Sequence, residues 1–129
     1  MSFRQFDVFM QNRPGEAARV TEAMAKKAVN IRGISTDLGA DKPMVRIITD
    51  DDATARAVLT QSALDFAERE VVVLSLADKP GELAKVIKKL AKAGINIESM
   101  FMLTSKSSMV EIALGVDRLD EAKKALDYS

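Results

Sequence analysis

Cysteine, histidine and tryptophan are all absent from this chain of 129 residues, and their absence excludes several classes of function. Without cysteine there is no disulfide, no thiolate nucleophile and no CxxC metal site. Without histidine, the commonest general base and the commonest zinc ligand are missing. Catalysis would have to use carboxylates, lysines, hydroxyl groups or the single Tyr128. We therefore expect no metal, no cofactor and no enzyme activity.

Proline and glycine are also scarce, at 3 and 6 residues, whereas 47% of the residues are hydrophobic. This composition excludes disordered and collagen-like chains. The 19 basic residues are balanced by 19 acidic ones, and a nucleic-acid-binding protein needs a surplus of cations. No segment reaches the roughly 18 apolar residues of a membrane span, and the first 15 residues lack the apolar stretch of a signal peptide. We expect a cytoplasmic protein with no nucleic-acid or membrane partner.

The chain repeats itself. The segment NRPGE at 12–16 returns as DKPGE at 78–82, and the Asn-Ile pair at 30–31 returns at 96–97, with the same separation along the chain in both cases. When the separation between the two copies is reduced by one position, MVxI at 44–47 also matches MVxI at 109–112. A repeat of this length predicts two copies of one structural unit. We expect one domain over residues 1–69 and a second over residues 70–129.

Within each copy, the hydrophobic pattern alternates between strand and helix periods. The expected strands cover 6–11, 30–38 and 44–49 in the first copy, and 70–77, 96–103 and 109–116 in the second. The expected helices cover 15–28, 53–64, 81–93 and 118–126, with N-caps for the shorter helices from Asp50 to Asp52 and from Asp117. Hairpin loops are expected at 39–43 and 104–108.

This order of elements predicts an α+β fold of two tandem ferredoxin-like units, each a βαββαβ arrangement with two helices on one face of an antiparallel sheet. Residues 65–69 are expected to form the fourth strand of the first unit and to run directly into the strand at 70–77. The second unit has no such segment after its last helix. We expect residues 1–4 to take that place.

The repeated loop and the repeated asparagine are the candidate binding elements. Proline fixes φ, glycine lets the backbone approach a ligand, and the helix that follows begins with unpaired N–H groups that attract a carboxylate. An asparagine side chain can donate to a carboxylate and accept from an ammonium. These are the two charged groups of a free amino acid. The same residues also make ordinary turns and helix starts, and this structural explanation stays open.

Both copies resemble the ACT domain, a small regulatory module of amino-acid metabolism. QNRPGE at 11–16 and ADKPGE at 77–82 look like its strand-to-helix loop, and AVNIRGIS at 28–35 and AGINIESM at 93–100 look like its helix-to-strand segment. The first loop is similar to the serine-sensing ACT domain of phosphoglycerate dehydrogenase, and INIESM is similar to the acetolactate synthase small subunit. Met10 stands where the serine-sensing relatives have histidine, so the resemblance does not imply serine specificity.

The resemblance implies an amino-acid effector held between two ACT units, at the loop of one and the Asn-Ile pair of the other. Two such sites are expected, one from Asn12, Pro14, Gly15, Asn96 and Ile97, and one from Asp78, Pro80, Gly81, Asn30 and Ile31. Asp78 would repel a ligand carboxylate, so its site is expected to be weaker. The implied function is that of a stand-alone regulatory protein, with a metabolic enzyme as partner.

An alternative is a constitutive regulatory subunit of a metabolic enzyme that binds no effector of its own. Unpaired edge strands also predict a homodimer or homotetramer. Met100, Met102 and Met109 are interpreted as core filling, with a soft binding surface as the second possibility. The run Asp50 to Asp52 is interpreted as a solvated helix cap in preference to a cation site.

Overall fold

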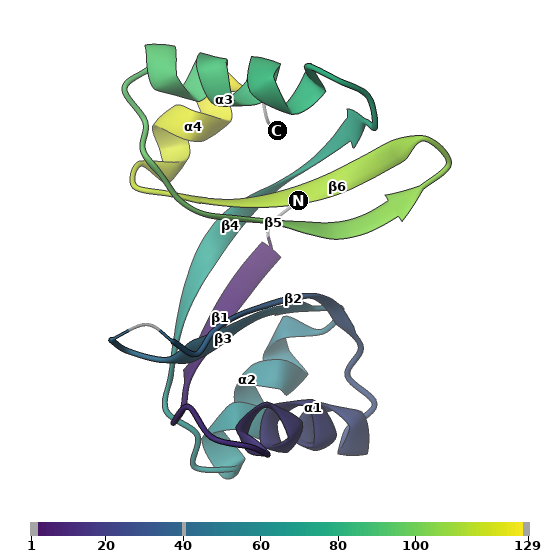
Figure 1. Cartoon of the computed structure of the whole chain (residues 1–129), viewed down its shortest axis with the longest axis vertical. Coiled ribbons are helices and arrows are strands. Elements are labelled where there is room, and N and C mark those ends of the chain that lie inside the picture. Colours follow the sequence, from purple (N-terminus) through teal and green to yellow (C-terminus); the bar gives the residue numbers. More distant parts are fainter. Residues whose placement is uncertain (1–2, 40, 128–129) are drawn as a thin grey trace. The chain divides into compact units, whose positions relative to one another are not determined.

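The computed structural model describes residues 3–39 and 41–127 (Figure 1). Ala40, in the first expected hairpin loop, and Tyr128 lie outside the described residues. The chain divides into two units between Arg69 and Glu70, and Phe3 belongs with the second unit. The predicted α+β class, with two tandem ferredoxin-like units, is confirmed.

The first unit has a sheet in the order β2-β3-β1-β4, with its helices covering one face (Figure 1). Its elements are β1 (Phe3–Phe9), α1 (Glu16–Lys26), β2 (Ile31–Asp37), β3 (Met44–Thr49), α2 (Asp52–Gln61) and the first residues of β4 (Phe66–Ala77). β1 and β2 both pair antiparallel with β3. The core joins Phe6 and Ile47 of the sheet to Val20 and Met24 of α1 and Leu59 of α2, all fully buried.

The second unit has a sheet in the order β4-β6-β5, also antiparallel, with its two helices on one face (Figure 1). Its further elements are α3 (Glu82–Lys92), β5 (Ile97–Lys106), β6 (Met109–Val116) and α4 (Leu119–Ala125). Val72, Leu90, Leu114 and Ala122 form the centre of its core. The long strand expected across residues 65–77 is therefore β4.

Strand pairing aligns the two units differently from the sequence. Phe6 pairs with Ile47 in the first unit, and Val72 pairs with Leu114 in the second. Val72 lies as many positions after Phe6 as Gly81 lies after Gly15. Leu114 lies one position further than this from Ile47. The expected match of residues 44–47 with 109–112 is therefore wrong. The second unit has one residue more between these paired strands, not one fewer.

The β5–β6 hairpin explains this difference. Lys106 pairs directly with Met109, which leaves a turn of two residues, and Ser107 and Ser108 both have positive φ, at 52° and 64°. A turn with two such residues is the type that matches the twist of a tight hairpin. The pairing of β5 with β6 also shifts register between Met102 and Ser105. β5 therefore continues to Lys106, beyond the predicted end at residue 103.

The helix caps agree with the prediction in the first unit only. Asp51 is the N-cap of α2, and its carboxylate accepts a hydrogen bond from Thr54 N–H at 3.1 Å. In the second unit the N-cap of α4 is Arg118, which makes no side-chain cap. The predicted cap by Asp117 is therefore wrong, because that carboxylate is bonded to Asn96.

The interpretation of the three methionines as core residues is also wrong. Met100, Met102 and Met109 are 43%, 63% and 41% exposed. Met100 and Met102 pair with the buried residues Leu114 and Ile112, but they lie on β5, which is an edge strand. Side chains on an edge strand have a neighbouring strand on one side only, so the sheet covers them less.

None of the helices in residues 3–39 and 41–127 is long and apolar enough to cross a membrane.

Candidate functional site

The loop before α1 has the geometry expected of a helix start open to a ligand. Gly15 is the N-cap, with a left-handed φ of 88°, and no side chain caps the helix. A β-carbon at this position would meet no atom within 4 Å, so the space beside the backbone is open. Asn12 and Pro14 are exposed. Within the described part of the chain, the Asn12 side chain has no hydrogen-bond partner.

The loop before α3 repeats this geometry closely. Gly81 is again the N-cap, with φ of 89° and no atom within 4 Å of a β-carbon. In both loops the N–H of the glutamate after glycine donates to the carbonyl three residues earlier, at 3.4 Å. Asp78 and Pro80 are exposed. In addition, the Asp78 backbone N–H donates to Ser108 O at 2.8 Å, which ties this loop to the β5–β6 turn.

The two asparagines before β2 and β5 are held by their backbones. Asn30 N–H donates to Asp50 Oδ1 at 3.0 Å, and Asn30 O accepts from Asp50 N–H at 3.1 Å. Asn96 makes the same pair of bonds with Asp117, at 3.0 and 3.2 Å. Both asparagine side chains are exposed, and among the described residues neither has a hydrogen-bond partner. Each amide is therefore presented to solvent from a fixed backbone.

A bulge follows each asparagine. The pairing shifts register between Ile31 and Gly33 in the first unit and between Ile97 and Ser99 in the second. Ile31 and Ile97 are half-buried and pack against their own cores, so they anchor the strand and leave only part of the side chain exposed. Bulges re-aim side chains and are common next to binding sites.

Each unit keeps its loop and its asparagine apart. They lie at opposite ends of helices of 11 residues, α1 and α3, which span about 16 Å at 1.5 Å per residue. One amino acid cannot touch both within a unit. The joining of the loop of one unit with the Asn-Ile pair of the other stays a prediction.

Sequence reasoning missed the role of the glutamate in the loop. The Glu16 carboxylate accepts from Gln11 N–H at 3.4 Å and pairs with Arg13 and Arg19 at 3.5 and 3.4 Å. Burial raises the pKa of Glu16, but the hydrogen bond from Gln11 and the two guanidinium groups outweigh it, so the pKa lies below its usual value. Glu82 pairs similarly with lysines. An anionic side chain at a helix start is itself stabilised by the positive end of the helix dipole.

The aspartate run does not gather into a metal site. Asp50 is bonded to Asn30, and Asp51 caps α2. No group of three acidic side chains in residues 3–39 and 41–127 is arranged to hold a metal ion.

The sequence pattern that defines the ACT domain pair family matches residues 1–127. The chain belongs to this family. Over 56 residues, which are 43% of this ACT domain pair, it is 46% identical to an aspartokinase of Corynebacterium glutamicum. The matched part is 13% of that aspartokinase, so the chain spans only a small part of its relative.

Two solved structures have a similar fold over 98% of the ACT domain pair. A protein from Bacteroides thetaiotaomicron is 27% identical, with a TM-score of 0.90 over 88% of its own chain. The ligand-free regulatory subunit of aspartate kinase from Thermus thermophilus is 21% identical, with a TM-score of 0.67 over 89% of its chain. These likenesses agree with the pair of ferredoxin-like units.

Proposed function

We propose that this ACT domain pair is a non-catalytic regulatory protein that binds a free amino acid and modulates an enzyme of amino-acid metabolism. The observation that carries the proposal is the duplicated presentation of the same groups. In both units an open helix start follows a left-handed glycine, and an exposed asparagine amide is fixed by an aspartate behind it.

The charges fit a zwitterion. The N–H groups at a helix start favour a carboxylate, and an asparagine amide binds both an ammonium and a carboxylate. The proposed sites combine Asn12, Pro14 and Gly15 with Asn96 and Ile97, and Asp78, Pro80 and Gly81 with Asn30 and Ile31. Binding that differs between two arrangements of the units would change which arrangement is populated, and a partner enzyme would read that change. The similarity of a 56-residue segment to an aspartokinase supports a partner of this class.

A thermal-shift screen against the 20 amino acids and related 2-oxo acids tests the proposal, because a ligand of the folded form raises its melting temperature. Calorimetry then gives the affinity of each hit. We expect Asn96→Ala and Asn12→Ala to weaken binding about tenfold, the loss typical of a hydrogen bond to a charged group. Gln11→Ala is the matched control, since Gln11 is an exposed amide next to Asn12. Equal effects of all three substitutions contradict the proposal.

The two sites are expected to differ. Asp78 places a carboxylate where the first unit has Asn12, and this charge repels the carboxylate of an amino acid. Asp78→Asn removes the repulsion and should strengthen the weaker site. Calorimetric titration would then show two sites of more similar affinity. An unchanged titration would mean that Asp78 does not face the ligand.

The exposed edge of the second unit favours a second candidate, a constitutive interaction subunit. Met100 and Met102 leave apolar surface on the edge strand β5, and such edges invite another chain. We also propose a homodimer or homotetramer on this ground, to be measured by light scattering. No heat with any amino acid, together with co-purification of a metabolic enzyme, would favour the constitutive subunit.

A further inference from the structure

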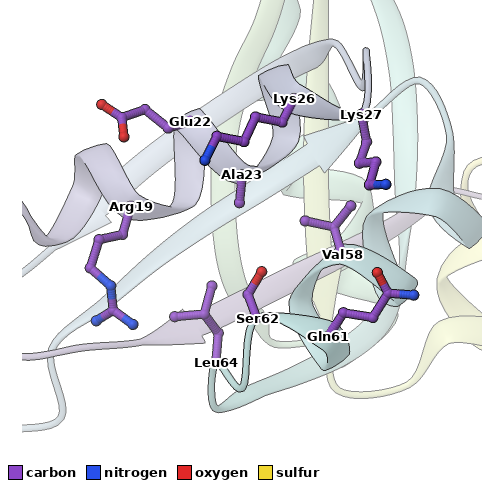
Figure 2. A pocket seen from close by; sticks show the side chains of 9 residues that line it. All are labelled: Arg19, Glu22, Ala23, Lys26, Lys27, Val58, Gln61, Ser62 and Leu64. Carbon is purple, nitrogen blue, oxygen red and sulfur yellow. The ribbon is translucent and has the colours of Figure 1, made fainter.

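The first unit carries a groove between α1 and α2 that the proposed amino-acid sites do not use. It has a volume of about 360 Å³, and Figure 2 shows its side chains. Its lining residues are Arg19, Glu22, Ala23, Lys26, Lys27, Val58, Gln61, Ser62 and Leu64. A second hollow of about 320 Å³ adjoins it, because both share Lys27, Val58 and Gln61. Together they have room for a ligand larger than an amino acid.

Positive charge gathers at this groove. Arg19, Lys26 and Lys27 are cations, and Glu22 is the one acidic residue of the lining. Figure 2 shows the Glu22 carboxylate directed away from Ser62. The Arg19 guanidinium forms an ion pair with the Glu16 carboxylate, at 3.4 Å. Across residues 3–39 and 41–127, Lys26 and Lys27 have no ion-pair partner.

Helix ends reduce this charge without cancelling it. The groove lies at the C-terminal ends of both helices, where Lys27 and Ser62 are the C-caps. Each helix end contributes about half a negative charge. Three cations less the Glu22 carboxylate leave two positive charges. The Glu16 carboxylate, which Arg13 and Arg19 share, offsets about half a charge more, and the two helix ends leave about half a positive charge in total. The groove therefore favours an anion over a cation.

The remaining surface suits an organic ligand. Ala23, Val58 and Leu64 give an apolar floor, and Ser62 and Gln61 add a hydroxyl and an amide at the rim (Figure 2). Val58 is 5% exposed and belongs to the core, so the floor is firmly supported. A few polar groups around an apolar floor are typical of small-molecule sites.

The second unit repeats these features only in part, since Arg19 and Lys26 correspond to Lys85 and Lys92. With the alignment from the strand register, Ala23 corresponds to Lys89, Lys27 to Ala93 and Val58 to Ala125. A lysine thus stands where the first unit has the alanine of the floor. Divergence at this place between two copies of one fold means that the fold does not require the groove.

Helix ends and ion pairs account for part of the positive charge at the groove. Lys26 lies in the last turn of α1, and its counterpart Lys92 lies in the last turn of α3. Lysines there stabilise the negative end of a helix. Arg19 lies in the first half of α1, where it pairs with Glu16 as Lys85 pairs with Glu82. Lys27, the C-cap of α1, has Ala93 as its counterpart, so it is the cation that the second unit lacks.

We propose that the groove between α1 and α2 binds a small organic anion, whose carboxylate or phosphate groups lie against Arg19, Lys26 and Lys27 while its apolar part rests on Ala23 and Leu64. This site is separate from the amino-acid sites, and its occupation does not depend on them.

Amide NMR titration of the full chain at low salt tests this site, with citrate and ADP as probes of the two anion types. We expect shifts at Ala23 and Ser62 with one of them, and Lys26→Gln should weaken its binding about tenfold. Lys92→Gln is the matched control in the second unit and should leave the affinity unchanged. The probe that binds identifies a carboxylate or a phosphate ligand.

Ala23→Lys separates a shaped site from general attraction, because it adds positive charge but replaces the small floor residue by a long one, the residue type that the second unit has at Lys89. We expect weaker binding, with folding checked by circular dichroism. Stronger binding after Ala23→Lys, equal losses from Lys26→Gln and Lys92→Gln, or no shift with either probe at millimolar concentration would each overturn the proposal. If Ala23→Lys does not fold, the comparison of Lys26→Gln with Lys92→Gln decides the outcome.

Discussion

Gly15→Ala is the most direct test of the structure at the proposed binding loop. Gly15 has φ of 88° at the start of α1. Alanine disfavours this left-handed conformation because its β-carbon approaches the following carbonyl group. No other atom lies within 4 Å of the added carbon. The substitution therefore changes backbone energy and adds no clash, which makes its effect simple to interpret.

The expected loss is about 1 to 2 kcal/mol in the free energy of unfolding, the usual cost of the left-handed region for an L residue. The entropy of unfolding is about 2.1 cal/mol/K per residue, or about 0.27 kcal/mol/K for a chain of this length. If the chain unfolds in one transition, the melting temperature should fall by about 4 to 7 °C. Gly15→Asn should lower it less, because asparagine tolerates this conformation better.

Calorimetry of the wild type and the variants measures this fall. Gly39→Ala is the control, since a β-carbon at Gly39 also meets no atom within 4 Å and its φ is not left-handed. The control should change the melting temperature little. Equal melting temperatures for Gly15→Ala and Gly39→Ala would show that Gly15 does not hold this conformation in solution.

Three further outcomes are expected. Met24→Ala should cost about 2 to 5 kcal/mol in denaturant unfolding, because Met24 is fully buried, and Met102→Ala, at 63% exposed, should cost less than about 0.5. Asp117→Ala should speed amide exchange at Asn96 and cost about 1 kcal/mol, because it removes the acceptor at 3.0 Å; unchanged exchange would contradict the bond. Hydrogen bonds, above all from a threonine hydroxyl, lower the pKa of Asp51, so its stabilising effect is present above the unfolded pKa and is lost as the pH falls below about 4. The stability difference between wild type and Asp51→Asn should shrink between pH 6 and pH 2.5 in thermal melts, and a constant difference would refute this.

Local patterns predicted most of the fold. The Pro-Gly pairs mark the starts of α1 and α3, and the asparagines mark the entry to β2 and β5, because turn and cap chemistry is local. Period-two hydrophobicity indicated the strands but could not tell an edge strand from a central one. Met100 therefore looked like a core residue, although only the order of the strands decides its exposure.

Long-range pairing accounts for the other errors. The match of residues 44–47 with 109–112 follows identical letters, whereas hydrogen bonding sets the register and places Leu114 opposite Val72. Asp117 was expected to cap α4, but it faces the backbone of Asn96 from the end of β6. The residue that bonds Asn96 and the residue that begins α4 are neighbours in the chain. The spacing of residue types in a sequence does not distinguish between two neighbouring positions.

The elements of the candidate site are predicted from the sequence repeat, and their combination into two sites is predicted from the resemblance to the ACT domain. Asn12, Gly15 and Asn96 were found from recurrence, which shows that a segment was duplicated but not what it contacts. The hydrogen bond from Gln11 to Glu16 depends on how the loop closes. The groove between α1 and α2 needs two helices packed together, so no local motif pointed to Arg19 and Ser62.

β4 belongs to both units, since it runs from Phe66 to Ala77 across the boundary between Arg69 and Glu70. A cut at this boundary would fall inside a strand and not inside a loop. Trypsin should therefore leave Arg69 uncleaved in the native state, and expression of either half alone should yield a protein with a frayed strand end that is prone to aggregate. The two repeats should therefore be expressed together as one chain.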